Sequence, residues 1–389
     1  MNLQMTIFDN RHNKLFDISE VVDDITISTD IEDQPGKCTF NLIRTENLAF
    51  WEGATVSIKL DGVKMFKGYV FSKKRTSDVD LIKVTAYDQL RYLKNKDSAV
   101  FENMTSSQIF SKLCEKYVLK YKVVSPSNYI CTPKSHKDAT LYDMISHSLS
   151  DTLYNTKKWF IIRDNYGTLE HIDINAMKTN IVLGDGRYVS DFDYESSIDK
   201  DVYNQIKLYR DNKETGKREV FIVNDSINNG DNFRWGLLQL HSKVSDNLST
   251  KQIEQRAIAM LGLYNNTSRR LKLKSQGISQ VTSGSIITLS IKDLGDISLN
   301  ENLLVTKCTH TIKTFSKIAK ASNNDKVDVI IGDVISVSPL KVSIGDDLIL
   351  TESFLIKSKF IQEKIITAIS PYNSTSFNIK LWDGVKVGD

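Results

Sequence analysis

The sequence has few of the residues that commonly carry catalytic or metal-binding chemistry. Its four cysteines (Cys38, Cys114, Cys131 and Cys308) lie far apart, and none belongs to a Cys-x-x-Cys pair. We therefore expect reduced thiols in the core rather than a metal site or a disulfide framework. The six histidines include no pair at i, i+4 spacing, and nucleophile elbows, zinc-protease motifs and phosphate-binding loops are missing. The sequence predicts no enzyme, no metal and no cofactor.

Net charge and long apolar runs are missing as well. The formal charge of +3 is too small for the overall basic surface of a nucleic-acid-binding protein. No apolar segment approaches the ~20 residues that a membrane span needs, and the start "MNLQMTIFDNRHNK" lacks the pattern of a signal peptide. Five prolines and no low-complexity segment argue against long disordered tails. We expect a soluble protein made in a cytoplasm.

What the sequence does contain is β-structure, beginning with residues 1–97. In "TVSIKLDGVKMFKGYV" two alternating runs flank Asp61-Gly62, which predicts a hairpin with a type I′ turn. A polar loop "SKKRTSDVD" and the strand "LIKVTAYD" follow, and Asp88 can cap a short helical turn. These features predict a β-barrel or sandwich with one apolar face.

A helical section interrupts the strands over residues 98–190. Thr105 and Gln108 form a capping box for one helix, whose apolar positions are Ile109, Phe110, Leu113, Cys114, Tyr117 and Val118. A second helix is expected from Thr140 onward. The run "WFIIRDNYGTLEHIDI" then predicts two strands joined by a turn at residues 165–167. We interpret this section as an α+β insert.

Strands return over residues 191–325 and again over residues 326–389. The first of these sections holds one helix, capped by Ser249 and Gln252, and ends in a polar linker at residues 321–326. The last section restarts alternating strands and ends in a hairpin around Asp383-Gly384, a length that suits a small OB-type barrel. The expected fold is mainly β with an α+β insert: a first barrel, the helical middle region, a second barrel with one helix, and a small C-terminal barrel.

One acidic stretch could carry chemistry. In "DFDYE" the carboxylates of Asp191, Asp193 and Glu195 share one side of a strand. Such carboxylates could bind Ca²⁺ or act as acid and nucleophile on a glycosidic bond. A solvated strand edge or a contact between subunits explains the same pattern, and we favour that interpretation.

Two basic stretches are weighed in the same way. Lys73, Lys74 and Arg75 fall in the polar loop, and "RRLKLK" places Arg270, Lys272 and Lys274 on one face of a strand. Without interleaved aromatic residues they are weak evidence for nucleic-acid binding. They fit a solvated or lumen-facing surface, or an acidic protein partner. The four tryptophans, which exposed together would suggest carbohydrate binding, are expected in the core.

The order of elements resembles a known family. The run "WEGATVSIKLDGVKMFKGYV", then "VTAYDQLRYL" and the capped helix "MTSSQIFSKLCEKY", is similar to the start of the central hub proteins of contractile phage tails. The similarity continues through "WFIIRDNYGTLEHI" and "SSIDKDVYNQIKLY" to "IEQRAIAMLGLYNN" and "GSIITLSIKDLGDISLNENLLVTKCTHTI", and so covers roughly residues 1–320. It is closest to the XkdQ-type hub family of Gram-positive phages and phage-like bacteriocins. The last segment resembles a small tail protein that is often encoded beside the hub.

The resemblance implies a structural role without enzymatic turnover. Hub proteins of this kind are homotrimers in which each chain contributes two barrels, so that three chains present six to the tail tube protein. The implied partners are the tail tube protein, the spike protein, the baseplate wedge proteins and a tape-measure protein in the lumen, with DNA only in transit in a true phage. The implied place is the baseplate at the tail tip, assembled in the bacterial cytoplasm. The alternatives are a tail-associated cell-wall hydrolase and a carbohydrate-binding tail-tip protein.

Overall fold

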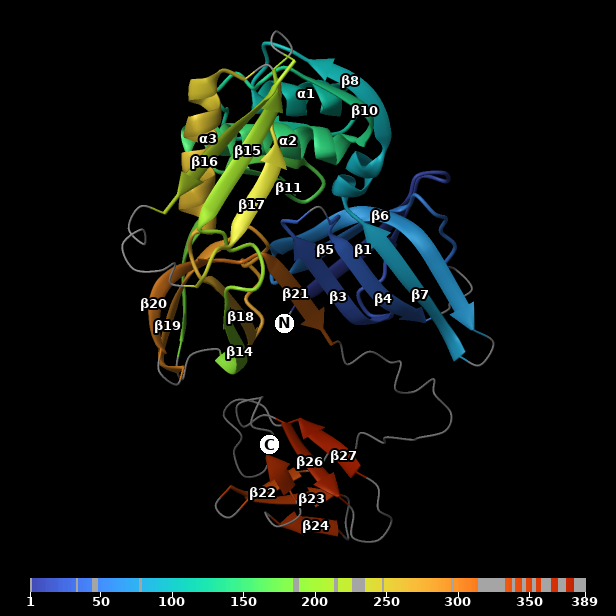
Figure 1. Ribbon diagram of the computed structural model, residues 1–389. Coiled ribbons are helices and arrows are strands. Elements are labelled where there is room, and N and C mark those ends of the chain that lie inside the picture. The colour runs from blue at the N-terminus through green and yellow to red at the C-terminus, as the bar shows by residue number, and fades with distance from the viewer. Residues whose placement is uncertain are drawn as a thin grey trace. The chain divides into compact units, whose positions relative to one another are not determined.

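The computed structural model shows a chain built mostly of strands (Figure 1). It forms two compact units: Met1–Thr76 with Leu81–Thr314, and Ser77–Asp80 with Phe315–Asp389. The mainly-β class with a helical middle region is confirmed. The residues that the structure describes are 2–32, 34–43, 48–76, 79–184, 189–212, 216–225, 235–246, 248–294, 297–313, 333–337, 340–344, 348–351, 355–357, 365–369 and 376–380.

The first unit begins with one large sheet, which is blue in Figure 1 except for the brown strand β21. Its eight strands lie in the order β2-β1-β5-β6-β7-β4-β3-β21, so a strand from the end of the unit completes a sheet that starts at residue 3. The described pairings do not join β2 to β21, so they form an open sheet rather than the closed barrel that was expected. The strands are β1 Leu3–Asp9, β2 Lys14–Asp17, β3 Val22–Asp30, β4 Lys37–Ile43, β5 Thr55–Leu60, β6 Val63–Thr76, β7 Val79–Tyr87 and β21 Lys307–Ile312.

Alternation of apolar and polar residues explains this sheet. The inward side chains of seven strands, from Met5 in β1 to Ile312 in β21, form a single buried cluster, so the sheet curves around its own core. The predicted β5–β6 hairpin is confirmed, and Asp61 and Gly62 both have the positive φ that a type I′ turn requires (49° and 80°).

A glycine makes the curvature possible at one position of β6. Gly68 lies between the inward-facing Phe66 and Val70, where a larger residue would be expected. A Cβ atom there would lie 2.3 Å from the carbonyl oxygen of Tyr87 and 2.7 Å from the Phe66 ring. The backbones approach so closely at this point that only glycine fits.

The middle region packs two helices against short strands. The expected capping box of Thr105 with Gln108 is present, and the second helix begins after Thr140 as expected, with a further capping box of Thr140 and Asp143. Val118 is an exception to the predicted apolar stripe: it follows the helix with φ of 54° and is 91% exposed. The elements are the 3₁₀ helices η1 Gln89–Lys94 and η2 Ile174–Met177, the helices α1 Ser106–Lys116 and α2 Leu141–Thr156, and the strands β8 Lys96–Phe101, β9 Tyr121–Val123, β10 Lys134–Thr140, β11 Phe160–Asp164 and β12 Leu169–Asp173.

A buried polar joint connects the large sheet to the middle region. Asp88 caps η1 by accepting from the N–H of Leu90, as predicted, and it also accepts from the N–H of Gly36 at 2.9 Å. Asp164, at the end of β11, accepts from the N–H of Gln89 (3.1 Å) and the N–H of Gly167 (2.6 Å). Burial raises the pKa of Asp164 to about 6. Burial, together with the nearby charge of Asp164, raises the pKa of Asp88 as well.

A second β unit follows the middle region. It consists of the sheet β13-β19-β20 and the pair β14-β18, which share one small core around Leu183, Ile287 and Leu289. The four-domain division stays a prediction, and two pairings cross its boundaries: β13 pairs with β19, and β21 pairs with β3. The strands are β13 Lys178–Gly184, β14 Val189–Ser197, β18 Ser268–Ser275, β19 Ile286–Leu294 and β20 Ile297–Leu304.

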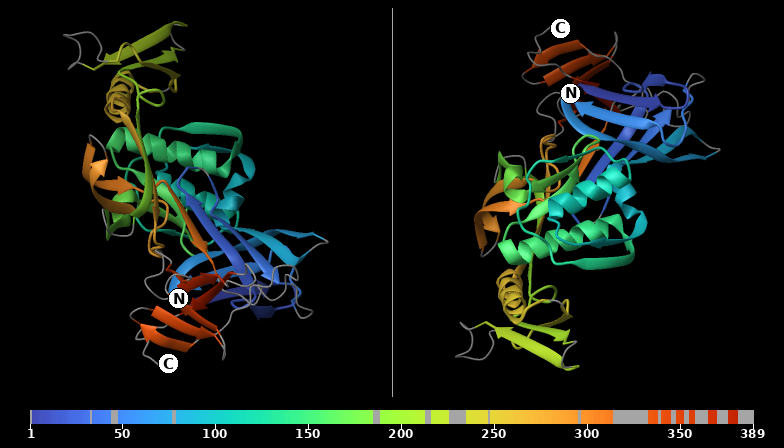
Figure 2. Two further views of the ribbon diagram at one scale, coloured as in Figure 1. Left: turned by 90° about the horizontal axis from the view of Figure 1, so that it is seen from below. Right: turned by 90° about the horizontal axis from the view of Figure 1, so that it is seen from above.

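A helix–sheet layer is inserted between β14 and β18. Its strands are ordered β16-β15-β17, and α3 covers one face of this sheet through Ile253, Ala257 and Met260. Ser249 and Gln252 form the predicted capping box of α3. In both views of Figure 2 the sheet is the outermost layer, with α3 between it and the middle region. The elements are β15 Gln205–Asp211, β16 Arg218–Asn224, β17 Gln239–Lys243 and α3 Thr250–Tyr264.

The second compact unit is described here by its backbone alone. Its six described strands form two antiparallel meanders, β22-β23-β24 and β25-β26-β27, and no described pairing joins them into the expected OB-type barrel. The expected linker at 321–326 and the Asp383-Gly384 turn lie outside the described residues. The strands are β22 Asp333–Val337, β23 Leu340–Ile344, β24 Leu348–Thr351, β25 Leu355–Lys357, β26 Ile365–Ile369 and β27 Ser376–Lys380.

The close backbone approach at Gly68 predicts opposite effects of two glycine substitutions. Gly68→Ala should lower the free energy of unfolding by about 1–3 kcal/mol, because the added methyl group collides with the Tyr87 backbone. Gly262→Ala, in open space within α3, should raise it by about 0.5–1 kcal/mol. Thermal and urea unfolding would measure both. Equal effects of the two variants would contradict the close approach.

The polar joint predicts a pH-dependent difference between the wild type and Asp164→Asn. An unfolded aspartate titrates near 3.8 and the folded Asp164 near 6, so the folded state binds this proton more tightly. The resulting stabilisation, roughly 3 kcal/mol, is complete below about pH 4 and is lost as the pH rises to about 6. The melting temperature of Asp164→Asn should therefore improve relative to the wild type between pH 4.5 and pH 7.

Glu102→Gln is the control for this measurement, since Glu102 is an exposed carboxylate directly after β8. Its melting temperature should differ from that of the wild type by the same amount at both pH values. A constant difference for Asp164→Asn as well would mean that this carboxyl is not desolvated in the folded protein.

Candidate interaction surfaces

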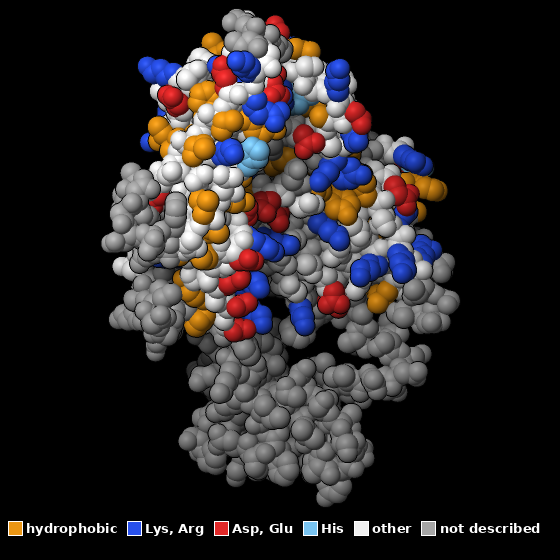
Figure 3. Space-filling model, viewed as in Figure 1, with side chains coloured by type: hydrophobic (Ala, Val, Ile, Leu, Met, Phe, Trp, Pro, Cys, Tyr) orange, Lys and Arg blue, Asp and Glu red, His pale blue; other side chains and the backbone are white. Residues whose placement is uncertain are grey.

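The acidic and basic stretches singled out in the sequence lie side by side on β14 and β18. Asp191 is opposite Lys274, Asp193 is opposite Lys272, and Glu195 is opposite Arg270. We call these six residues the charge ladder. Figure 3 shows acidic and basic side chains next to each other over the two strands. The structure thus joins two stripes that the sequence presents nearly eighty positions apart.

The ladder is ion-paired and exposed. The Lys272 ammonium lies 3.0 Å from an Asp193 oxygen, and the Lys274 ammonium lies 2.9 Å from an Asp191 oxygen. The hydrogen bond from Lys274 holds the pKa of Asp191 below its usual value. A general acid in glycoside hydrolysis needs a raised pKa. Asp191 therefore does not fit that role, and the pattern is that of a solvated, charge-paired strand face.

The basic residues of β6 do not lie in a loop, as was expected from the sequence. β6 continues through Thr76, so that Lys73, Lys74 and Arg75 are part of a long strand. The Lys73 ammonium donates to the carbonyl of Phe50 at 2.6 Å and lies over the rings of Phe50 and Trp51. Lys73 therefore has a structural contact, whereas Lys74 and Arg75 are exposed. An interface or lumen role for these residues remains a prediction.

Two tryptophans differ from the expectation that they would be core residues. Trp51 and Trp159 are both exposed, and Arg11 stacks on Trp51 with its guanidinium carbon 5.1 Å from the ring centroid. Trp235 is partly buried, and Trp382 lies outside the described residues. Trp51 is occupied by cations on its ring, which is a contact within the protein rather than a sugar platform.

A third surface was missed in the sequence: the outer face of the sheet β16-β15-β17. The register places Lys207 opposite both Ile222 and His241, and Tyr209 opposite both Val220 and Lys243. We call the outward-facing residues of these strands the open face, because no described element packs on it. Its members are Gln205, Lys207, Tyr209 and Asp211 of β15, Arg218, Val220, Ile222 and Asn224 of β16, and Gln239, His241 and Lys243 of β17.

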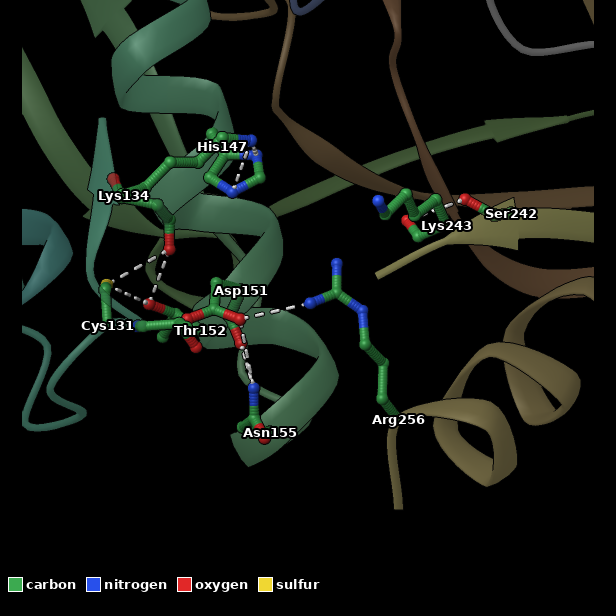
Figure 4. A network of polar contacts seen from close by, with 11 residues as sticks. Cys131, Lys134, His147, Asp151, Thr152, Asn155, Ser242, Lys243 and Arg256 are labelled. Atoms are coloured by element: carbon green, nitrogen blue, oxygen red, sulfur yellow. Dashed lines mark hydrogen bonds and ion pairs between the residues drawn. The ribbon is translucent and has the colours of Figure 1, made fainter. Parts of the chain in front are cut away.

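The middle region and the helix–sheet layer meet through a buried carboxylate. Asp151 on α2 accepts from the N–H of Thr132 at 2.8 Å, and from the side chains of Asn155 and Arg256 at 3.3 and 3.4 Å (Figure 4). Arg256 belongs to α3, so this ion pair links the two helices. Breaking a buried pair of this kind by removing one partner is strongly destabilising. The network is structural, and it fixes the position from which the open face is presented.

The thiols are not arranged for nucleophilic chemistry. Burial raises the pKa of Cys114 to about 12 and those of Cys131 and Cys308 to about 11. Among the described residues, the histidine that contacts a thiol is His310, whose Nε2 lies 3.3 Å from the Cys308 sulfur. Their i, i+2 spacing on β21 is a pairing that the sequence analysis overlooked. Nε2 donates to the carbonyl of Val281 at 2.8 Å, so it cannot accept the thiol proton.

The described residues were searched for clusters of metal ligands and for membrane-spanning helices. No group of three or more His, Cys, Asp or Glu side chains suited to a metal ion occurs among the described residues. Over the same residues, no helix has the length and apolar character needed to cross a membrane.

Comparison with known proteins places the chain in a family. A family model described as YQBQ-like matches residues 25–318, about three quarters of the chain. The chain belongs to the YQBQ-like family. A second model, described as a protein of unknown function (DUF2577), matches residues 314–375 of this YQBQ-like protein. The two matches meet at the point where the first compact unit ends.

Two relatives from Bacillus subtilis (strain 168) agree with this membership. The uncharacterized protein YqbQ is 31% identical over 249 residues, which are 63% of this chain and 73% of YqbQ. The phage-like element PBSX protein XkdQ is 30% identical over 251 residues, which are 63% of this chain and 74% of XkdQ. The resemblance to the XkdQ family that the sequence indicates is confirmed.

Solved structures share the fold of this YQBQ-like protein. The 43 kDa tail protein of prophage MuSo2 from Shewanella oneidensis superposes with a TM-score of 0.61 at 14% identity, covering 80% of this chain and 95% of that one. A tail protein from Neisseria meningitidis MC58 gives 0.59 at 11% identity, covering 81% and 94%. The prophage tail protein gp18 from Listeria monocytogenes EGD-e gives 0.52 at 11% identity, covering 79% and 90%. At these identities the likeness establishes the fold alone.

The charge ladder predicts a charge-swap result. Lys272→Glu should lower the melting temperature, because it places a carboxylate opposite Asp193. The double variant Asp193→Lys with Lys272→Glu should recover it, and both effects should shrink in high salt. Lys137→Glu, at an exposed position in β10, is the control for the charge change alone. A double variant that melts no higher than Lys272→Glu would mean that the two strands are not paired in this register.

Proposed function

We propose that this protein is a structural subunit of the tail of a phage or phage-like particle. Two kinds of comparison support the proposal. The sequence places the chain in the YQBQ-like family with XkdQ, named as a protein of a phage-like element, and the fold is shared with three phage tail proteins. The fold likeness carries the most weight, because it extends over 80% of this chain and 95% of the MuSo2 tail protein.

We further propose that the subunit is the hub of the tail tip. In this role three copies form a ring in which the large sheet and the second β unit of each chain alternate, giving six β positions. The observation that supports this step is that β21, which follows directly on β20 of the second β unit, pairs with β3 at the edge of the large sheet, so that one chain passes straight from one β unit into the other. The large sheet has eight described strands and the second β unit has five, so the sixfold symmetry of such a ring is approximate.

In the proposed ring, each partner protein contacts a different surface. The six β positions face the tail tube protein, the threefold side faces the spike protein, and baseplate wedge proteins surround the ring. A tape-measure protein occupies the lumen, and in a true phage DNA passes through it. The net charge of +3 suits passage, because a strongly basic lumen would retain DNA through counterion release. The C-terminal unit is proposed as a small tail protein fused to the hub on the spike side.

The two alternative functions have less support. The hydrolase proposal rested on the carboxylates of residues 191–195, and Asp191 and Asp193 are engaged with lysines. The carbohydrate-binding proposal rested on clustered exposed tryptophans, and the exposed Trp51 is covered by Arg11 and Lys73. A structural role in an assembly therefore uses the observed surfaces best.

Native mass spectrometry of the purified full chain tests the hub proposal. The expected species is a trimer of 44.2 kDa chains, stable at micromolar concentration and across moderate salt. Cryo-electron microscopy of the same sample should show a ring with threefold symmetry and a central channel. A protein that stays monomeric or dimeric under all conditions, and is missing from purified particles, would contradict the proposal.

A further inference from the structure

The open face has the composition of a surface that is covered in the working protein. Val220 and Ile222, on the edge strand β16, are 47% and 52% exposed, and Val220 lies opposite Tyr209 of the central strand β15. The Tyr209 ring stacks on His241 with centroids 4.9 Å apart, and the Arg218 guanidinium lies 4.5 Å from its centroid. Figure 3 shows hydrophobic, histidine and basic side chains together over β15, β16 and β17. Contiguous exposed apolar groups with a polar rim mark interaction sites.

The sequence of β16 supports this interpretation independently. β15 alternates, with Ile206 and Leu208 buried against α3 and polar or aromatic residues between them, as a strand covered on one face should. β16 instead reads "VFIV" at positions 220–223, a continuous apolar run typical of a strand buried on both faces. Phe221 and Val223 reach the α3 core, whereas Val220 and Ile222 lack any described cover.

The rim of the open face is basic. Lys207, Arg218 and Lys243 project from it, and only one of its own residues, Asp211, is acidic. Asp211 is shared between two of these cations, lying 2.9 Å from Arg218 and 2.7 Å from Lys243. Lys243 also lies 3.6 Å from Asp246, which follows β17. Lys207 pairs with no carboxylate among the described residues. The face therefore offers an uncompensated positive charge next to apolar side chains, and an acidic surface complements it.

A second copy of this chain fits the open face poorly. A twofold contact of the face with itself would bring the same cations together, and like charges across an interface are costly. The acidic column of the charge ladder is also unsuitable, because its Asp191 and Asp193 already pair with lysines of their own chain. The occupant that the charges favour is a different protein.

We propose that the open face docks a separate protein of the particle, one that presents apolar side chains surrounded by carboxylates. The proposal rests on the tail function only for where this protein is found. The three strands cover roughly 300 Å² at ~4.8 Å between strands and ~3.4 Å per residue. A standard interface takes about 800 Å² from each partner. The docked protein therefore also covers neighbouring surface, or it gains affinity from several open faces in one ring.

Site-specific photo-crosslinking in assembled particles tests the proposal. The full chain carries p-benzoylphenylalanine in the variant Ile222→p-benzoylphenylalanine and is expressed in a strain that produces the particles and lacks its own copy. The same replacement at Val100, which is similarly exposed on β8, is the matched control. Mass spectrometry of the linked peptides identifies the occupant. The expected product joins position 222 to an Asp- or Glu-rich surface segment of a different protein.

Charge reversal at the rim provides the second measurement. Lys207→Glu, added to the crosslinking variant, should lower the yield of this product at least tenfold, whereas Lys137→Glu should leave it unchanged. Melting curves of each variant confirm that the fold is retained. A crosslink to the different protein that depends on Lys207 supports the proposal.

Three results would overturn it. A link only to another copy of this chain would make the face a contact within the ring. No link above the Val100 control in particles that contain the chain would leave the face uncovered. A crosslink yield that Lys207→Glu leaves unchanged would mean that the docked protein does not present an acidic surface to Lys207. Failure of the tail function itself is a separate readout, since the chain would then be missing from the particles and monomeric in native mass spectrometry.

Discussion

The pairing of β21 with β3 is the constraint on which the architecture of the first unit depends. Six residue pairs, from Lys307 with Asp30 to Ile312 with Ile25, join segments nearly three hundred positions apart. Ile312 adds its side chain to the core of the large sheet. Everything between β7 and β21 is therefore an excursion that must leave the sheet and return to its edge. Closing such a long loop has an entropic cost. This cost is offset because the intervening residues fold into packed layers of their own.

Polar contacts decide how this excursion leaves and returns. At its start, the carboxylates of Asp88 and Asp164 bind the backbone of both neighbouring regions. At its end, Thr29 contacts Thr282 through its hydroxyl (3.1 Å) and accepts from the N–H of Ser283. Hydrogen bonds to buried groups are costly to leave unmade, so they specify one arrangement of the layers more strongly than apolar packing does. The raised pKa of Asp164 reflects the cost of burying charge for that purpose.

Local signals in the sequence were sufficient to predict the parts of the fold that depend on residues close together in the chain. The Asp61-Gly62 turn and the capping box at Thr105 follow from backbone φ and from end groups that a few residues satisfy. Partner choice between distant strands has no such signal, which is why the return of β21 to β3 and the register of the charge ladder were not predicted. The open face did have a signal in the sequence, which is the continuous apolar run of β16. Packing against α3 accounts for only every second residue of this run, and the other residues form the open face.

The charge ladder and the open face differ in what an interface would gain from them. Four of the ladder's six charges are already ion-paired and hydrated, so covering them yields little net affinity and mainly sets orientation. Val220 and Ile222 still expose about half of their surface, and burying the remainder is worth about 1 kcal/mol for each side chain. Affinity should therefore come from the open face, and orientation from the ladder. A subunit with both kinds of surface can bind a partner firmly and in a single orientation.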